Sequence, residues 1–256
     1  ERDTPMKTLQ TMDKRCGWWL GLLAAALAGA PAASGITYGL KSKNYYNTPA
    51  GQFSGSPTHL FRFREDGSQF TDLGQVSLGG AGIDADGLAI SPQWGLMGFQ
   101  LTERNDANDV PRDARLVAID PVTAAASPVG SWLAGRDVRG AVFDLADRLW
   151  ALDARNDELL RVDPATGGVV SGSAVALSLD EDTTSDIAVR HDGQFYLTSY
   201  DRAAGESVIY ELDQVSGALQ AVHGEPGQGL VGLTFSEAAE ADHVFAFEVN
   251  DNSVSG

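Results

Sequence analysis

Two aspartates and one arginine each lie at the start of a short apolar run in this sequence. Asp86 and Arg139 each directly precede such a run, and Asp186 begins one. Carboxylates and a guanidinium at one place can neutralise each other as an ion-pair group, or can hold a small polar ligand. If the runs are neighbouring strands, these side chains meet at one end of the molecule, which makes them the first candidates for a binding site.

The same residues offer a weaker case for a metal ion. Asp84, Asp86 and Asp186 could supply oxygen ligands, and residues 84–87 are similar to the first half of a calcium loop. Calcium prefers about six to eight oxygens, and no further ligand follows in register. Residues 103–109 and 180–182 are also acidic, although solvated loops are the simpler interpretation. We therefore expect no cofactor, with Ca²⁺ as the alternative.

Signals of catalysis are missing from the sequence. It contains no nucleophile elbow, zinc-protease motif, phosphate loop or dinucleotide fingerprint. None of the histidines has a partner at zinc-like spacing; they are His59, His191, His223 and His243. We therefore predict no catalytic residues. This balance favours binding over catalysis, while leaving open whether the protein is an enzyme.

A short motif of alternating apolar residues occurs four times in the sequence. In three of the four copies an Asp follows directly. The copies begin at Leu60, Leu116, Leu159 and Ile209, at intervals of 56, 43 and 50 residues. Repetition on this scale indicates small supersecondary units, each of which buries its apolar face against the next.

In most copies, this motif is the third in a series of four short runs rich in Val, Ile, Phe and Tyr. Gly, Asp and Pro turns separate the runs, a pattern that predicts antiparallel strands, and no stretch has a useful helical period. Four-stranded units of this length are typical of β-propeller blades. We predict an all-β propeller in which the first strand of each blade lines a central channel and the fourth forms the rim.

Counting the runs gives three complete blades and two partial ones. The complete blades span residues 87–130, 140–172 and 186–222. An N-terminal set (36–40, 58–63 and 70–74) lacks an inner strand, and a C-terminal set contains 232–235 and 244–249. The pattern fits a four-bladed ring with one surplus strand, or a fragment of a larger ring, which we favour.

The turn between the third and fourth strands has its own chemistry. Asp120, Asp163 and Asp213 begin this turn, with Thr or Ser three residues later and then Gly in two copies. An Asp carboxylate at this place accepts hydrogen bonds from turn N–H groups, and Gly adopts positive φ without strain. We interpret these aspartates as structural.

The Leu-x-x-Ile-Asp-Pro-x-Thr-Gly pattern resembles secreted bacterial β-propellers, in the broad group of quinoprotein-like, NHL-like and lactonase-like repeats. The resemblance covers roughly residues 36–250. It implies the propeller architecture and leaves the activity open. In lactonase-like members it implies a divalent metal at the channel mouth, where Asp86 and Asp186 stand in this chain.

The N-terminal residues have the order of a secretory signal peptide. Lys7, Lys14 and Arg15 precede an uncharged apolar run at 18–30, and small residues continue to Ser34. We predict cleavage between Ala30 and Ser34, so residues 1–34 form a leader with an upstream extension. Residues 35–256 then form the propeller domain, which we expect to be truncated at its C-terminus.

The only cysteine, Cys16, leaves with the leader, and no membrane span is expected in the mature chain.

The formal net charge of −17 indicates which partners the surface excludes. Such a surface repels nucleic acids and anionic membranes. We expect a secreted, periplasmic or extracellular monomer that binds an unidentified ligand or protein and is not an enzyme. The alternative is a metal-dependent hydrolytic propeller of the lactonase or lyase type, with its site at the channel mouth.

Overall fold

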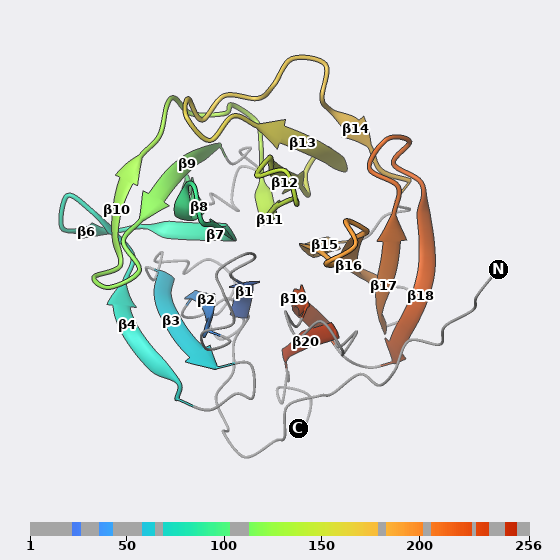
Figure 1. Cartoon of the computed structure of the whole chain (residues 1–256), viewed down its shortest axis with the longest axis horizontal. Helices are drawn as coiled ribbons and strands as arrows, with labels where there is room; N and C mark the ends of the chain where they lie inside the picture. The colour runs from blue at the N-terminus through green and yellow to red at the C-terminus, as the bar shows by residue number, and fades with distance from the viewer. Residues whose placement is uncertain are drawn as a thin grey trace, which may run out of the picture.

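The computed structural model describes residues 22–26, 36–42, 58–64, 69–102, 113–178, 183–201, 206–226, 229–235 and 244–249. In these ranges the regular structure is β throughout, without a helix. No described segment is therefore a helix long and apolar enough to cross a membrane. Four larger sheets and a two-stranded fifth sheet surround a central axis (Figure 1). The prediction of an all-β propeller is confirmed.

Blade 1 contains four strands in chain order: β1 (Leu22–Ala26), β2 (Ile36–Ser42), β3 (Thr58–Arg64) and β4 (Thr71–Gln75). The expectation that this blade lacks an inner strand is wrong, because β1 runs antiparallel to β2 in that position. An uncharged run of Leu and Ala suits the core of a signal peptide and a buried inner strand equally well. Composition alone could not separate the two roles, and cleavage of the leader stays a prediction.

Blade 2 is the largest sheet because a short hairpin extends its rim. Its main strands are β7 (Asp84–Ser91), β8 (Gly95–Leu101), β9 (Ala114–Ile119) and β10 (Ala125–Pro128). The hairpin consists of β5 (Ser77–Leu78) and β6 (Ala81–Gly82), and β5 pairs in parallel with β10. Because β5 directly follows blade 1 in the chain, this pairing joins the rims of the two blades.

Blades 3 and 4 follow the simple four-stranded order. Blade 3 contains β11 (Val138–Phe143), β12 (Leu149–Asp153), β13 (Glu158–Val162) and β14 (Val175–Ala176). Blade 4 contains β15 (Thr183–Val189), β16 (Phe195–Asp201), β17 (Glu206–Leu212) and β18 (Leu219–Pro226).

The outer strand of blade 3 corrects one sequence expectation. We expected blade 3 to span residues 140–172, but its fourth strand is β14 (Val175–Ala176), and Val169 forms only an isolated bridge to Val162. The Ser173 hydroxyl accepts the Arg161 N–H and donates to Val170 O, which curves the chain before it pairs.

The fifth sheet consists of β19 (Gly229–Phe235) and β20 (Val244–Val249) in the described residues. The inner strands touch in a closed circuit, in the order β1, β7, β11, β15, β19 and back to β1. They surround the centre in Figure 1, and the fourth strands of the blades form the rim, as predicted. The described chain therefore has four complete blades and one two-stranded sheet, where the sequence indicated three complete and two partial blades.

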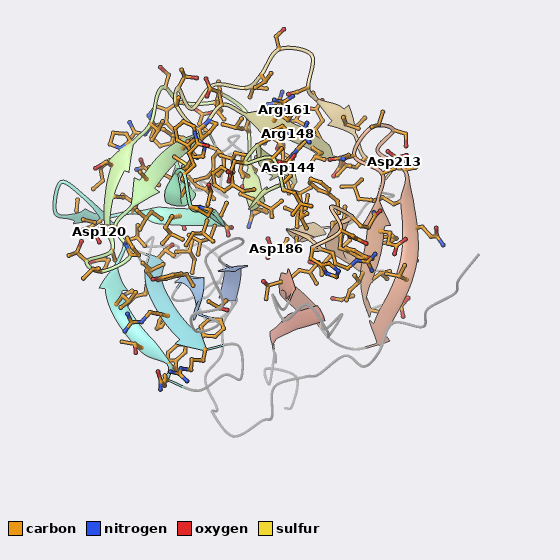
Figure 2. All side chains as sticks on the ribbon, viewed as in Figure 1. Asp120, Asp144, Arg148, Arg161, Asp186 and Asp213 are labelled. Atoms are coloured by element: carbon orange, nitrogen blue, oxygen red, sulfur yellow. The ribbon has the colours of Figure 1, made fainter. Side chains whose placement is uncertain are left out.

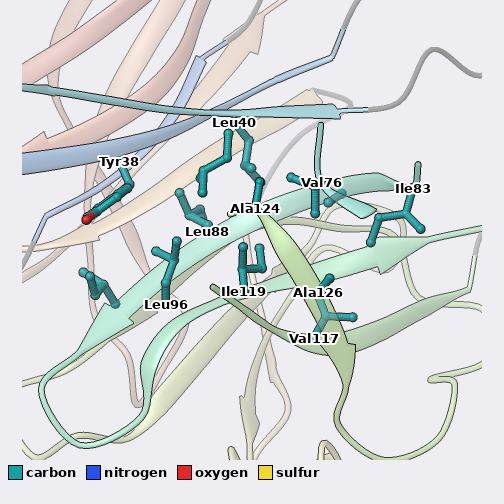
Figure 3. Packing of buried hydrophobic residues seen from close by; sticks show 13 residues of the cluster. Tyr38, Leu40, Val76, Ile83, Leu88, Leu96, Val117, Ile119, Ala124 and Ala126 are labelled. Atoms are coloured by element: carbon teal, nitrogen blue, oxygen red, sulfur yellow. The ribbon is translucent and has the colours of Figure 1, made fainter. Parts of the chain in front are cut away.

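The apolar cores lie between the blades. Between blades 1 and 2, Tyr38 and Leu40 pack with Leu88, Leu96 and Ile119 (Figure 3). Separate clusters fill the junctions between blades 2 and 3 and between blades 3 and 4. Each blade thus buries its faces against its neighbours, as the internal repeat predicted.

The structural role of the turn aspartates is also confirmed. Asp120 Oδ1 accepts the Val122 N–H at 2.7 Å, and Asp213 Oδ1 accepts the Val215 N–H at 2.8 Å. Asp163 accepts the Thr166 hydroxyl at 2.7 Å. These bonds favour the ionised carboxylate and lower the pKa of all three aspartates. Asp120 and Asp213 lie at the rim (Figure 2), far from the central channel.

Candidate functional site

The candidate site lies at the end of the channel where the inner strands begin. Four of these strands carry a β-bulge near their first residues: between Asp86 and Ala89, between Val138 and Gly140, between Thr184 and Asp186, and between Leu230 and Gly232. A bulge adds a residue to one strand and turns the side chains beside it away from the regular alternation. Arg139 is itself the extra residue of β11. We name this region, with Asp86, Arg139, Asp137 and Asp186, the channel mouth.

Arg139 joins two carboxylates at the channel mouth. Its Nη1 atom lies 3.8 Å from Asp86 Oδ2 of the neighbouring blade, and its Nη2 atom donates to Asp137 Oδ2 at 2.8 Å. The three side chains are only 18%, 23% and 19% exposed for Arg139, Asp86 and Asp137 respectively. Partial burial strengthens such charge pairs and makes an unpaired charge costly. Sequence reasoning indicated Asp86 and Arg139 but not Asp137.

Asp186 is buried beside the centre of the ring (Figure 2) and makes a different set of bonds. Its Oδ1 atom accepts the Ile187 N–H at 2.8 Å, and its Oδ2 atom accepts the Leu233 N–H of β19 at 2.9 Å. Burial raises the pKa of Asp186 well above its ordinary value, and the nearby charge of Asp86 raises it further. Asp186 therefore connects blade 4 to the fifth sheet and is almost inaccessible to a ligand.

Gly140 lets the inner strands approach closely next to Asp186. A Cβ atom on Gly140 would lie 2.9 Å from both Asp186 Oδ1 and the Ile187 nitrogen. No side chain fits there without movement of the backbone. The absence of a side chain at 140 is therefore part of what positions Asp186.

Asp84 is directed to another junction. Its Oδ1 atom accepts a long hydrogen bond of 3.4 Å from the Thr58 hydroxyl, and Thr58 also bonds both backbone groups of Ala85. In the described ranges, no three His, Cys, Asp or Glu side chains form a group suited to a metal ion. Asp84, Asp86 and Asp186 thus do not fit the oxygen cage that calcium prefers, and we derive no chemistry from a metal.

A second polar cluster next to the channel mouth was missed by sequence reasoning. Asp153, at the end of β12, is fully buried and accepts Arg136 Nη1 at 2.8 Å, Asn156 Nδ2 at 2.7 Å and the Asp137 N–H at 3.1 Å. Arg136 also pairs with Glu158. Burial lowers the pKa of Arg136, but these two carboxylates outweigh it and raise that pKa. The Asp-x-x-Asn spacing at the end of an apolar strand was the available signal.

Several residues considered from sequence contribute nothing to the described site. His59 lies on β3 with Nδ1 3.1 Å from Asp72 Oδ2, and His191 lies in an exposed turn of blade 4. The side chain of His223 is not described. His243, both acidic loops (103–109 and 180–182) and the cleavage segment 30–34 lie outside the described residues.

No protein-family model matches this chain, and no curated protein matches its sequence. Its fold is similar to an α-L-arabinofuranosidase from Clostridium thermocellum, with TM-score 0.53 and 12% identity over 85% of this chain and 79% of the other. It is also similar to a PQQ-bound aldose sugar dehydrogenase from Streptomyces coelicolor, with TM-score 0.51 and 12% identity over 90% and 75%. At such identities the likeness supports the propeller fold alone.

A weaker likeness links the chain to virginiamycin B lyase from Staphylococcus aureus. The TM-score is 0.47 and the identity 14%, over 90% of this chain. The chain spans 64% of the length of that lyase, which is less than two thirds. This likeness carries no argument about activity.

Proposed function

We propose that this chain is a secreted β-propeller that binds a small polar ligand at the channel mouth and is not an enzyme. The observation that carries the proposal is the partly buried set of Asp86, Arg139 and Asp137, joined at 3.8 and 2.8 Å. It presents donors and acceptors within one small area, held by strands of two neighbouring blades. Such a set can hold a ligand with both kinds of polar group.

Binding is favoured over catalysis by the state of the neighbouring acid. A general acid or base must reach the proton that it transfers. Asp186 has the raised pKa expected of such a group, but it is 1% exposed and both its oxygens accept backbone N–H bonds. The bond from Leu233 connects Asp186 to β19.

A thermal-shift panel tests the binding proposal. Putrescine, acetate and glucose serve as cationic, anionic and neutral probes, and a ligand of the folded state raises Tm as its concentration rises. We expect at least one probe to raise the Tm of the wild type, and Asp86→Asn or Arg139→Gln to abolish that shift. Asp192→Asn is the control, because Asp192 pairs with Arg190 in a turn at the opposite end of the channel. A shift that persists in Asp86→Asn and Arg139→Gln would contradict the proposal.

The hydrolytic alternative would use a metal at Asp84, Asp86 and Asp186. It is tested by the same assay with Ca²⁺, Mg²⁺, Mn²⁺ and Zn²⁺. A Tm that follows the metal concentration, and does not in Asp86→Asn, would favour the alternative over non-enzymatic binding.

Export is a separate part of the proposal, supported by the charge order and apolar run of residues 7–34. Cleavage between Ala30 and Ser34 would remove β1, so a cleaved leader and a ring that includes residues 22–26 exclude each other. N-terminal sequencing of the exported protein tests this. A mature chain that still contains residues 22–26 would contradict the cleavage.

A further inference from the structure

One carboxylate oxygen at the channel mouth is buried without a hydrogen-bond partner. Asp137 Oδ2 accepts Arg139 Nη2 at 2.8 Å, whereas Asp137 Oδ1 is buried and accepts no hydrogen bond in the described part of the chain. A buried acceptor without a donor is costly, and most of all when it belongs to a charged group. Folded proteins keep few such atoms. Asp137 Oδ1 therefore points to a donor that comes from a ligand.

The backbone of Asp137 is fixed on both sides by blade 3. Its N–H donates to Asp153 Oδ1 at 3.1 Å, and its carbonyl accepts the Ala154 N–H at 2.9 Å. Asp153 is fully buried and is itself held by Arg136 and Asn156. The second polar cluster thus positions the Asp137 carboxylate before a ligand arrives, and such preorganisation lowers the entropic cost of binding.

The charges at the channel mouth indicate which kind of donor fits. Arg139 lies between two carboxylates, at 3.8 Å from Asp86 and 2.8 Å from Asp137. Among the described residues, Arg139 is the one cation that pairs with Asp137. A ligand donor with a positive charge would form a charge-assisted hydrogen bond, which is roughly twice as strong as a neutral one. Asp137 Oδ1 therefore favours a cation over a neutral or anionic ligand.

A ligand reaches this buried oxygen only when a neighbouring side chain moves. Arg139 bonds the same carboxylate and is 18% exposed. Its separation of 3.8 Å from Asp86 is longer than a hydrogen bond. The guanidinium can therefore move closer to Asp86 as a second cation takes its place at Asp137, which leaves both carboxylates paired.

We propose that the channel mouth selects a ligand with a primary ammonium group, and that Asp137 determines this selectivity. The ammonium donates to Asp137 Oδ1, and Arg139 turns toward Asp86. An ammonium is a compact cation with several donors, which suits a small and partly buried site. The net charge of −17 attracts such a cation over longer distances. The inference rests on the proposed function, because it names the class of ligand for the same site.

Putrescine and the diol with the same carbon chain are matched probes, because hydroxyl groups replace only the ammonium groups. Isothermal titration calorimetry with the full chain measures both, in about 0.15 M NaCl, which screens nonspecific attraction to the acidic surface. We expect saturable binding of putrescine and no measurable binding of the diol. This comparison uses the wild type alone, so it decides the proposal even if a variant does not fold.

Asp137→Asn tests the residue itself. The amide oxygen can still accept from Arg139, but its NH₂ group then stands at the Oδ1 position and faces the ligand donor. We expect putrescine binding to weaken about tenfold or more. Asp192→Asn is the matched control, because it removes the same charge from another aspartate–arginine pair. We expect the control to leave the affinity unchanged, and urea denaturation checks that both variants are folded.

The proposal is overturned if putrescine does not saturate or if the diol binds equally well. It is also overturned if Asp137→Asn and Asp192→Asn weaken binding equally, which would indicate counter-ion attraction only. Titrations with acetate and glucose separate it from the proposed function. If one of these binds, is lost in Arg139→Gln, and putrescine does not bind, the ligand site stands and the cation selectivity is wrong. If none of the probes binds, the proposed function fails as well.

Discussion

The two junctions on either side of blade 4 bury different kinds of side chain. Toward blade 3, Trp150 and Phe195 meet edge to face with ring centroids 5.6 Å apart, among Leu152, Leu159 and Leu197. Toward the fifth sheet, the described cluster is smaller and consists of Ala188, Tyr196, Ile209 and Leu233. Asp186 and Thr198 are buried near it, and the Thr198 hydroxyl has no hydrogen-bond partner in the described part of the chain.

The described side chains of the two junctions therefore differ in character. Apolar burial stabilises in proportion to the area removed from water, and aromatic pairs add about 0.5–1.5 kcal/mol. A buried hydroxyl without a partner costs about 1–3 kcal/mol. At the junction with the fifth sheet, the Asp186–Leu233 hydrogen bond adds a polar connection. This junction borders the channel mouth.

Matched leucines test the comparison most strongly. Leu197 and Leu233 are both at most 1% exposed, but only Leu197 lies in the junction with blade 3. We expect Leu197→Ala to lower the free energy of unfolding by about 4 kcal/mol and Leu233→Ala by about 2 kcal/mol, because the cost rises with the cavity that remains. Urea denaturation measures both. Equal losses would contradict the proposed difference between the junctions.

Gly140→Ala tests the close approach of β11 to Asp186. The added methyl group would lie 2.9 Å from Asp186 Oδ1, so we expect a loss of about 2 kcal/mol from overpacking. Gly168→Ala is the control, because its Cβ would make an ordinary contact of 3.6 Å with Thr166. We expect the control to change stability by less than about 0.5 kcal/mol in urea denaturation. A tolerated alanine at 140 would show that β15 can move away.

The pH dependence of stability tests the Asp186 bridge. Its pKa is 3.8 in the unfolded chain and higher in the folded protein. The stability due to neutral Asp186 is therefore full below about pH 3.8 and is lost as the pH rises through the folded pKa. Asp186→Asn cannot ionise and leaves one of the two backbone N–H groups without an acceptor, at about 1 kcal/mol. We expect the variant to be less stable than the wild type at pH 4, with a smaller difference at pH 8. A difference that grows with pH would contradict this.

The smallest effect is expected at Asp213, in the turn between the third and fourth strands of blade 4. Asp213→Ala removes the bonds to the Val215 and Ser216 N–H groups, which lower the pKa of Asp213. The stability that this carboxylate contributes is present above its unfolded pKa and lost as the pH falls through the folded one. We expect a small decrease in Tm at pH 7, below that of the other variants, which disappears at low pH. Asp213→Asn is the control, because an amide oxygen can still accept one of these bonds.

The turns between third and fourth strands could be predicted from sequence because their bonds are local. Each aspartate accepts from N–H groups two or three residues later, so the residue types at those places decide the contact. The same holds for the strands, whose alternation is visible in a few residues. Asp153 was missed because its partners include Arg136, which lies 17 residues earlier in the chain and comes close to it only in the folded blade.

By itself, the sequence determined the all-β repeat, these turns and the candidate charges at the channel mouth. Only the tertiary structure decided that residues 22–26 form an inner strand and that Asp84 turns to Thr58. It alone decided that Asp186 accepts a bond from Leu233, 47 residues away. The reason is physical: alternation and turn bonds depend on near neighbours, whereas these contacts depend on strand register, bulges and the packing of one blade on the next.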